Sequence, residues 1–145
     1  MYLLDTHTFL WYVSANPNLP QEISETISKA DQVYLSIISL WEIAIKQSLN
    51  KMTYKDSIIK LGEVCRILNI NILALDLFAV ERIKTLPFIH RDPFDRMLVA
   101  QAQEKNLTII TKDGIIPQYD VSTLKVLPMS RTIEFYPLEN RGGIW

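Results

Sequence analysis

The sequence has little of the residue types that build disulfides and soft metal sites. Its single cysteine, Cys65, excludes a disulfide within the chain, and with only two histidines a structural zinc site is not expected. Cys65 falls in a helical, largely apolar stretch, where a small buried thiol is the ordinary interpretation. This usage fits a protein of the reducing cytoplasm.

Long apolar runs are missing as well. No run approaches the roughly 18 residues of a membrane span, and Glu42 interrupts VYLSIISLWEIAI, so no transmembrane helix is predicted. The N-terminal MYLLDTHTFLW has neither a basic region nor a small-residue cleavage site, which argues against a signal peptide. We therefore expect a cytoplasmic protein with no membrane partner.

The chain also lacks a dominant charge. Its formal net charge is −1, whereas nucleic-acid-binding domains are usually basic. If several acids gather in one site, however, the remaining surface is mildly basic, so the net charge decides nothing about an RNA partner. What is present is a globular composition: 145 residues, of which 48% are hydrophobic, suit one domain with a core.

Apolar runs with strand character alternate with helical patterns along the chain. We expect strands at 2–5, 33–36, 71–76 and 107–111, with 123–127 as a fifth, and helices between them, including 40–49, 56–68 and 92–105. Strands that are apolar throughout and alternate with helices indicate a parallel sheet covered on both faces. The predicted fold is a three-layer α/β/α sandwich around four to five parallel strands.

The last residues depart from this pattern. Residues 128–145, PMSRTIEFYPLENRGGIW, have no clear period, and an extra strand, a disordered tail and an expression artefact remain open for them. We expect the domain to span 1–127 and place no function in the tail.

Four acids are predicted to meet at one edge of the sheet. Asp5 ends the first strand and Asp113 follows the fourth, and in open α/β sheets ligands bind at the carboxyl ends of the strands. Glu42 in SLWE and Asp95 in DPFD each occupy the third position of an expected helix, which brings them to the same edge. Ser39 and Asp92 are the expected caps of these two helices.

Each acid also has an ordinary structural interpretation. Glu42 and Asp95 fit a capping box, Asp113 before Gly114 fits a turn, and Asp5 fits the cap of the helix that follows it. These interpretations do not exclude function, because a capping carboxylate is held ionised by the helix dipole, as a metal ligand must be.

The energetic cost of clustering favours a shared function. Two carboxylates about 6 Å apart repel by roughly 3 kcal/mol at an effective dielectric constant of about 20. Several together protonate in part unless a cation holds them. A set of carboxylates without histidine or cysteine selects hard ions such as Mg²⁺ or Mn²⁺, which activate water and bind phosphates. The pattern therefore predicts phosphodiester chemistry.

Four motifs together resemble the PIN-domain nucleases, and most closely the VapC-type toxins of bacterial toxin–antitoxin modules. They are LLDTHTFLW at 3–11, SLWEIAIK at 39–46, HRDPFDRMLVAQA at 90–102 and LTIITKD at 107–113. The resemblance covers residues 1 to about 125 in the family's order and spacing. It implies a ribonuclease whose acidic site coordinates Mg²⁺ or Mn²⁺.

The resemblance also assigns residues and partners. The family's acidic quartet falls on Asp5, Glu42, Asp95 and Asp113, which are the expected metal ligands and catalytic residues. The expected supporting residues are Ser39, Thr111, Asp92 and Thr6. The expected partners are an RNA substrate, a small antitoxin that inserts a segment, often with an arginine, into the acidic site, and a second copy of the chain in a homodimer.

Several charged and aromatic residues have two interpretations. Arg96 is a candidate phosphate contact, although an exposed helical arginine paired with an acid is the simpler interpretation. The lysines at 46, 51, 55 and 60 fit a solvated helix surface better than a phosphate-binding face. His7 and His90 are interpreted as structural, because a hard-ion site does not need them.

Three competing functions fit less well. A HAD-like phosphatase needs a second acid two residues after the first, and that position is His7. A receiver domain needs an acidic pair near the first strand and a phospho-acceptor aspartate after the third, and neither is evident. A catalytically silent PIN-like binding module remains as the alternative, and the complete acid set argues against it.

Overall fold

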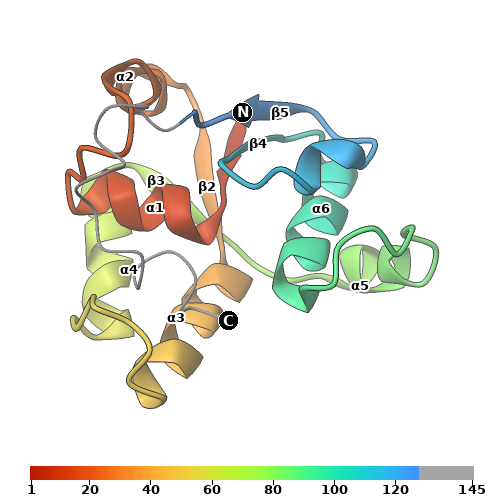
Figure 1. The fold of residues 1–145 in the computed structure, drawn as a ribbon, viewed down its shortest axis with the longest axis horizontal. Coiled ribbons are helices and arrows are strands. Elements are labelled where there is room, and N and C mark those ends of the chain that lie inside the picture. Colours follow the sequence, from red (N-terminus) through yellow and green to blue (C-terminus); the bar gives the residue numbers. More distant parts are fainter. Residues whose placement is uncertain (128–145) are drawn as a thin grey trace.

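Five parallel strands form one sheet in the order β3-β2-β1-β4-β5 (Figure 1). The computed structural model describes residues 1–127, so the alternatives for the tail at 128–145 lie outside the described residues. The strands are β1 (Tyr2–Leu4), β2 (Val33–Ser36), β3 (Ile70–Leu73), β4 (Thr108–Thr111) and β5 (Thr123–Lys125), and every pairing is parallel. The predicted parallel sheet is confirmed, including its fifth strand.

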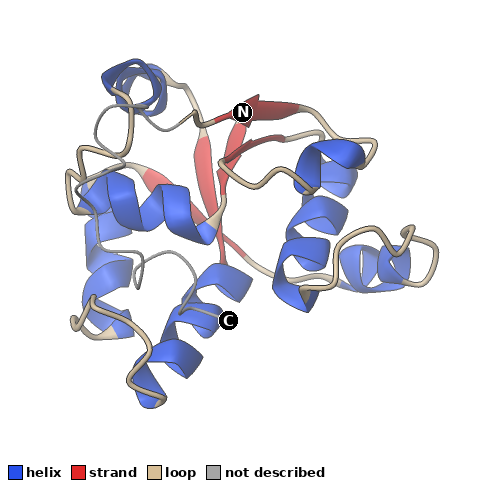
Figure 2. Cartoon of the chain, viewed as in Figure 1, coloured by secondary structure: helices blue, strands red, loops and turns tan. Residues whose placement is uncertain are grey.

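Helices cover both faces of this sheet (Figure 2). One layer holds α1 (Thr6–Val13), α2 (Gln21–Lys29), α3 (Ile37–Ser48) and α4 (Ile58–Ile67), and the other holds α5 (Leu77–Ile83) and α6 (Pro93–Lys105). A short 3₁₀ helix, η1 (Ile116–Gln118), connects β4 to β5. The predicted α/β/α sandwich is therefore confirmed, and it places all strand ends at one edge.

The central strand β1 separates two apolar cores. Leu4 packs in one cluster with residues such as Phe9 and Ile43, whereas Leu3 packs in the other with Leu98, and both leucines are fully buried. Successive side chains of a strand point to opposite faces, so this short strand supplies both cores. Each such leucine contributes about 1.5–3 kcal/mol of burial energy. The strand that leads into Asp5 is thereby packed against a core on both faces.

The start of α3 differs from the prediction. The helix begins at Ile37 and not near Leu40, and its cap is Ser36, whose Oγ accepts a hydrogen bond from the Ile38 N–H (3.1 Å). The prediction of Ser39 as the cap is wrong, because β2 runs directly into the helix and the earlier serine, Ser36, caps it. Glu42 consequently lies in the second turn and not at the third helical position.

No helix within residues 1–127 is both long enough and apolar enough to cross a membrane.

Candidate functional site

A cavity of about 500 Å³ opens at the carboxyl edge of the sheet. All four acids singled out in the sequence line it: Asp5 after β1, Glu42 on α3, Asp95 on α6 and Asp113 after β4. The parallel sheet explains this convergence, since β1 and β4 are neighbours that end at the same level. The structure thus brings together residues that are up to about a hundred positions apart in the chain.

The two strand-end acids are joined through Thr111. Asp5 caps α1 by accepting the Thr8 N–H at Oδ1 (2.8 Å), and its Oδ2 accepts the Thr111 hydroxyl (2.5 Å). The same hydroxyl oxygen accepts the Asp113 N–H (2.9 Å). Asp113 also forms the expected turn, because its Oδ1 accepts the Ile115 N–H (2.5 Å). Capping and turn roles therefore coexist with a place in the cavity.

The two aspartates at the start of α6 have different roles, as their spacing suggests. Asp92 is the N-cap and its Oδ1 accepts the Phe94 N–H (2.9 Å), while Asp95 is the third helical residue. The capping-box interpretation of Asp95 is wrong, because the Asp92 N–H that the box would use donates to His90 Nδ1 (3.1 Å). Asp95 therefore does not cap α6, and its side chain lines the cavity.

His90 lies inside the acidic cavity, contrary to its interpretation as a purely structural residue. Its Nε2 is 2.9 Å from Asp113 Oδ2 and 3.1 Å from Asp95 Oδ2. Because Nδ1 accepts the Asp92 N–H, the ring proton is on Nε2, which donates to Asp113 Oδ2 while Asp95 Oδ2 lies in contact with the same nitrogen. The tautomer makes His90 a hydrogen-bond donor that holds Asp95 and Asp113 together.

The α3 side of the cavity is built around Glu42. Its Oε1 accepts the Thr6 hydroxyl (2.6 Å), and Thr6 Oγ1 is also 3.0 Å from Ser39 Oγ. Its Oε2 accepts the ammonium of Lys46 one turn further along the helix (2.5 Å). The solvated-surface interpretation is therefore wrong for Lys46, which is buried, whereas Lys51, Lys55 and Lys60 are exposed.

The carboxylates in the cavity do not ionise alike. Burial, followed by the negative charges of Asp92, Asp5, Glu42 and Asp113, raises the pKa of Asp95 to about 9. Burial also raises the pKa of Asp5, against the hydrogen bonds from Thr111 and Thr8. Burial acts in the same direction on Asp113, but its hydrogen bonds from His90, Ile115 and Ile116 outweigh that effect and lower its pKa.

Basic groups lie at the rim of the cavity. His7, Arg91 and Lys112 line it together with the acids, and the Lys112 ammonium lies 4.8 Å from the centre of the Trp11 ring. Burial, and then the charges of Lys112 and Lys46, lowers the pKa of His7 to about 4, so this histidine is neutral at pH 7. The cavity therefore combines an acidic floor with a partly basic entrance.

Arg96 does not have either role considered from the sequence. It is buried, and its guanidinium donates to the carbonyl oxygens of Pro87 (2.9 Å) and Leu86 (3.3 Å) and to the Tyr119 hydroxyl (3.2 Å). It also stacks on Phe88, with Cζ 4.6 Å from the ring centre. The interpretation as an exposed, acid-paired arginine is wrong, and because Arg96 does not line the cavity we do not retain a phosphate contact.

Two residues were missed as site residues, and each had a weak sequence signal. His90 precedes the Asp92 cap by two residues, a spacing that allows a side chain to accept the cap's N–H. Lys46 follows Glu42 by four residues, the spacing of a helical ion pair. Neither spacing reveals burial, which depends on elements elsewhere in the chain.

The donor set fits a hard divalent cation. Carboxylate oxygens reach the cavity from four segments of the chain. Burial and then repulsion between the acids disfavour the ionised form of Asp95, and a cation would relieve both effects. Nε2 of His90 and one oxygen each of Asp95 and Asp113 lie within 4.8 Å of one another. His90 is nevertheless a poor ligand in this geometry, since its Nε2 carries the proton.

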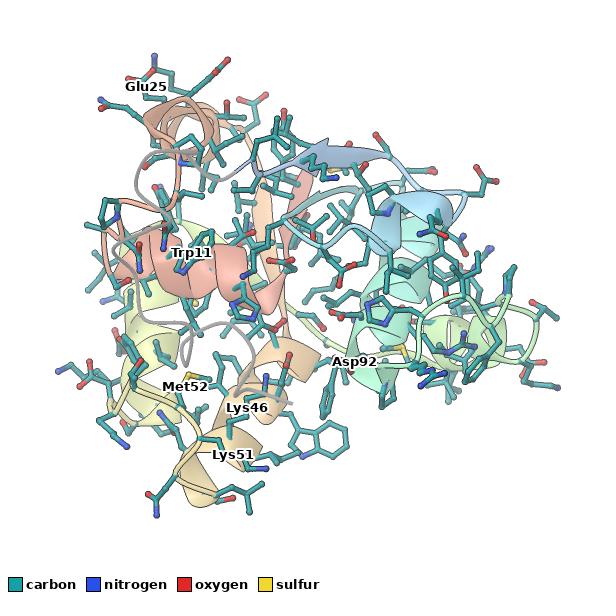
Figure 3. The ribbon with its side chains drawn as sticks, viewed as in Figure 1. Trp11, Glu25, Lys46, Lys51, Met52 and Asp92 are labelled. Atoms are coloured by element: carbon teal, nitrogen blue, oxygen red, sulfur yellow. The ribbon has the colours of Figure 1, made fainter. Side chains whose placement is uncertain are left out.

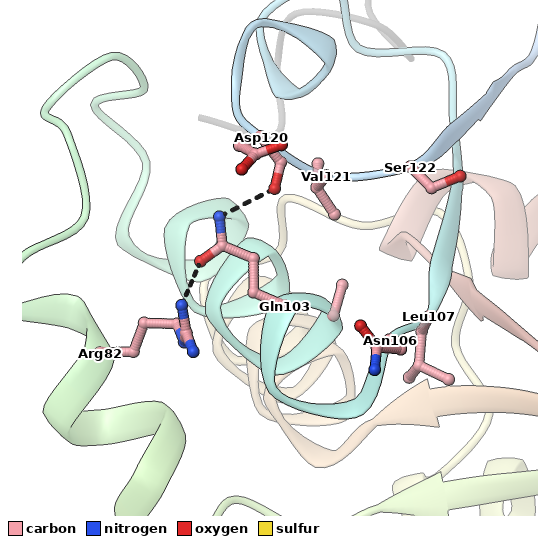
Figure 4. Close-up of a pocket in the computed structure, with 8 residues that line it drawn as sticks. Arg82, Gln103, Asn106, Leu107, Asp120, Val121 and Ser122 are labelled. Atoms are coloured by element: carbon pink, nitrogen blue, oxygen red, sulfur yellow. Dashed lines mark hydrogen bonds between the residues drawn. The ribbon is translucent and has the colours of Figure 1, made fainter.

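A second cavity, of about 400 Å³, lies between α6 and the segment before β5 (Figure 4). Its polar side chains bind one another: Arg82 Nη1 donates to Gln103 Oε1 (3.3 Å), and Gln103 Nε2 donates to the Asp120 carbonyl (3.1 Å). Only one of its lining residues is acidic. It carries none of the chemistry gathered at the strand ends.

A comparison with protein families gives one match. A family model described as a PIN domain matches residues 2–122, which include all four acids and Thr111. No curated protein sequence matches the chain significantly.

Solved structures share the fold over most of the chain. VapBC2 from Rickettsia felis, solved bound to a DNA fragment from its promoter, matches with a TM-score of 0.66 at 14% identity, covering 86% of this chain and 97% of the other. FitAcB from Neisseria gonorrhoeae gives 0.61 at 21% identity, covering 86% and 97%. VapBC-1 from nontypeable Haemophilus influenzae gives 0.62 at 21% identity, covering 86% and 96%. At these identities the likeness establishes the fold.

Proposed function

Because the chain belongs to the PIN domain family, we propose that it is a metal-dependent endoribonuclease and the toxin of a toxin–antitoxin pair. The observation that carries the proposal is the convergence of Asp5, Glu42, Asp95 and Asp113 on one cavity, where burial and then the charges of Asp92 and the other three acids raise the pKa of Asp95 to about 9. The ionised form of Asp95 is unfavourable in this cavity and does not stabilise the fold. A bound cation would stabilise that ionised form.

The proposed cofactor is Mg²⁺ or Mn²⁺, bound in the cavity that the four carboxylates line. When bound, such an ion supplies Lewis acidity that offsets charge on the phosphoryl oxygens and makes water more acidic. Thr111 and Thr6 orient Asp5 and Glu42 through hydrogen bonds of 2.5 and 2.6 Å. Ser39 supports Thr6, and Asp92 fixes both the start of α6 and the ring of His90.

The chain's own groups also suit a phosphodiester substrate. Arg91 and Lys112 at the rim give the polyanionic backbone a favourable approach that the acidic floor alone would deny. His90, through its contacts with Asp95 and Asp113, would keep these two carboxylates together where they hold the ion. We propose cleavage that leaves a 5′-phosphate and a 3′-hydroxyl on the RNA.

A small antitoxin is the proposed protein partner, and a homodimer in the cytoplasm is the proposed state of the toxin. The structural neighbours named VapBC and FitAcB support the antitoxin. An arginine inserted by the antitoxin would meet the acidic floor at Asp95 and Asp113, where a guanidinium fits two carboxylates. Such an insertion would inhibit by taking the place of the cation.

Incubation of the purified full chain with structured RNA and Mn²⁺ or Mg²⁺ tests the enzyme proposal. We expect discrete cuts that require the ion, that map by sequencing of the 5′-phosphorylated ends, and that disappear in Asp95→Asn. Intact RNA at all ion concentrations, together with identical behaviour of the wild type and Asp95→Asn, would support a silent binding module instead.

A further inference from the structure

Lys46 is a buried cation that the proposed chemistry does not use. Its side chain is 1% exposed, although lysine is rarely buried without a functional or structural reason. Its Nζ lies 2.5 Å from Glu42 Oε2. Burial lowers the pKa of this ammonium, and the hydrogen bond to Glu42 and the charges of Glu42, Asp92 and Asp95 act against that shift. Figure 3 labels Lys46 on α3. A positive charge is thus built into the acidic site.

The two sides of the cavity differ in how their oxygens are engaged. On the α3 side, Thr6 contacts Glu42 Oε1 at 2.6 Å and Lys46 contacts Oε2 at 2.5 Å, so both oxygens already have donors. On the other side, Asp95 and Asp113 converge on one another across His90. The oxygens that converge without an ammonium between them are therefore those of α6 and the β4 end.

We propose that the Lys46 ammonium takes the place of a second divalent ion, so that each chain binds one Mg²⁺ or Mn²⁺, on the Asp95–Asp113 side. This inference rests on the proposed metal-dependent function and deepens it by fixing the number of ions. A divalent ion at Glu42 would lie next to Nζ and be repelled by it. Displacing Nζ would leave a buried ammonium without its carboxylate, which is costly.

Titration of the metal-free full chain with Mn²⁺ tests this, with calorimetry for the stoichiometry and electron paramagnetic resonance for coupling between ions. We expect one Mn²⁺ per chain in the wild type. In Lys46→Gln, whose amide can still donate to Glu42 but carries no charge, we expect a second Mn²⁺ to bind. We also expect the first ion to bind about ten-fold more tightly, because one positive charge has left the site.

Two variants control the experiment. Lys46→Arg keeps a cation and is expected to bind one ion, and Lys51→Gln removes an exposed charge shortly after α3 and is expected to match the wild type. Lys46→Met, which also removes the donor, is expected to reproduce the second ion seen with Lys46→Gln. Circular dichroism identifies any variant that fails to fold.

The outcomes separate this inference from the proposed function. A wild type that cleaves RNA but binds two Mn²⁺ per chain overturns the Lys46 inference alone, whether or not the variants fold. A folded Lys46→Gln variant that binds one Mn²⁺ with the affinity of the wild type also overturns the Lys46 inference. A wild type that neither binds Mn²⁺ nor cleaves RNA overturns the proposed function. One ion in the wild type and two in Lys46→Gln supports the inference.

Discussion

The two sides of the acidic cavity manage the same problem of crowded negative charge in different ways. On the α3 side, Glu42 pairs with the buried ammonium of Lys46, whose Nζ lies 2.5 Å from Oε2. On the α6 and β4 side, Asp95 and Asp113 both contact the Nε2 of His90 and no ammonium. The first side is compensated in the folded protein, whereas the second needs an ion or a proton.

This difference suggests how a cavity that we propose to bind a metal ion can be both stable and selective. If no acid were compensated by a cation, several repulsions of a few kcal/mol each would lower the free energy of unfolding. If every acid were paired with a cation, the cavity would have no affinity for a divalent ion. Compensating one side confines the affinity to the other, and the following experiments test that division.

Asp95→Asn is expected to have the largest effect, because it removes a cavity acid whose pKa burial and the neighbouring negative charges raise to about 9. We expect RNA cleavage to fall by about 10²–10³-fold, as when one preorganised stabilising group is lost. We expect the metal-free Tm to rise by about 3 °C or more, because repulsion is relieved. Glu42→Gln is the matched variant on the other side and should not raise Tm, since it leaves Lys46 without its carboxylate. Equal Tm changes in the two variants would contradict the division.

His90→Leu is expected to weaken Mn²⁺ binding by about 10–100-fold, the usual cost of losing a residue that orients metal ligands. The reason is that Asp95 and Asp113 lose the donor that holds them together. His90→Gln retains an N–H donor near the Nε2 position and should restore most of the affinity in calorimetry. If Gln and Leu were equally impaired, His90 would be a ligand and not a donor.

Arg96→Met is expected to affect stability but not the metal site. Two backbone carbonyls and the Tyr119 hydroxyl lose their buried donor, which costs about 2–3 kcal/mol in chemical denaturation. The Mn²⁺ affinity of the folded fraction should stay within about two-fold, because Arg96 points away from its neighbour Asp95. Arg91→Met at the rim is the control, with unchanged stability and weaker RNA binding.

The smallest expected effect is a dependence of metal-free stability on pH. The pKa of Asp95 is about 9 in the folded protein and 3.8 ordinarily, so the folded state holds more protons between these values. Stability should therefore fall as pH rises from 7 to 8, by at most about 1.4 kcal/mol per unit. His7, with its pKa lowered to about 4, is neutral in both states above pH 7 and does not contribute. Asp95→Asn or saturating Mn²⁺ should flatten the slope in denaturant titrations.

The placement of the strand-end acids could be predicted because it depends on topology alone. Asp5 and Asp113 follow neighbouring parallel strands, and no side-chain detail is needed to bring them together. Glu42 reached the same cavity although its helix was predicted to begin too late, since three residues are close to one helical turn. A helical pattern that repeats over the whole of α3 predicts which residues share a face even when the predicted start of the helix is wrong by about one turn.

The roles of His90, Lys46 and Arg96 could not be predicted in this way. Each depends on a single contact made by folding: the Asp92 N–H fixes the ring of His90, and Glu42 meets Lys46 inside the core. Arg96 and Asp95 are adjacent in sequence, yet one binds backbone carbonyls and the other lines the cavity. Sequence gives the residue type, but burial and hydrogen-bond partners come from elements distant in the chain.

The Tyr119 hydroxyl connects the segment before α6 to the segment around η1. Its oxygen lies 3.1 Å from the Ile89 N–H and 2.7 Å from the His90 N–H, while Arg96 donates to it from α6. These two amides precede α6, so no helical carbonyl protects them from solvent. Their hydrogen exchange should therefore follow the release of the segment around η1, and not the fraying of α6. Local unfolding near Tyr119 would loosen His90 and uncouple Asp95 from Asp113 in a single event.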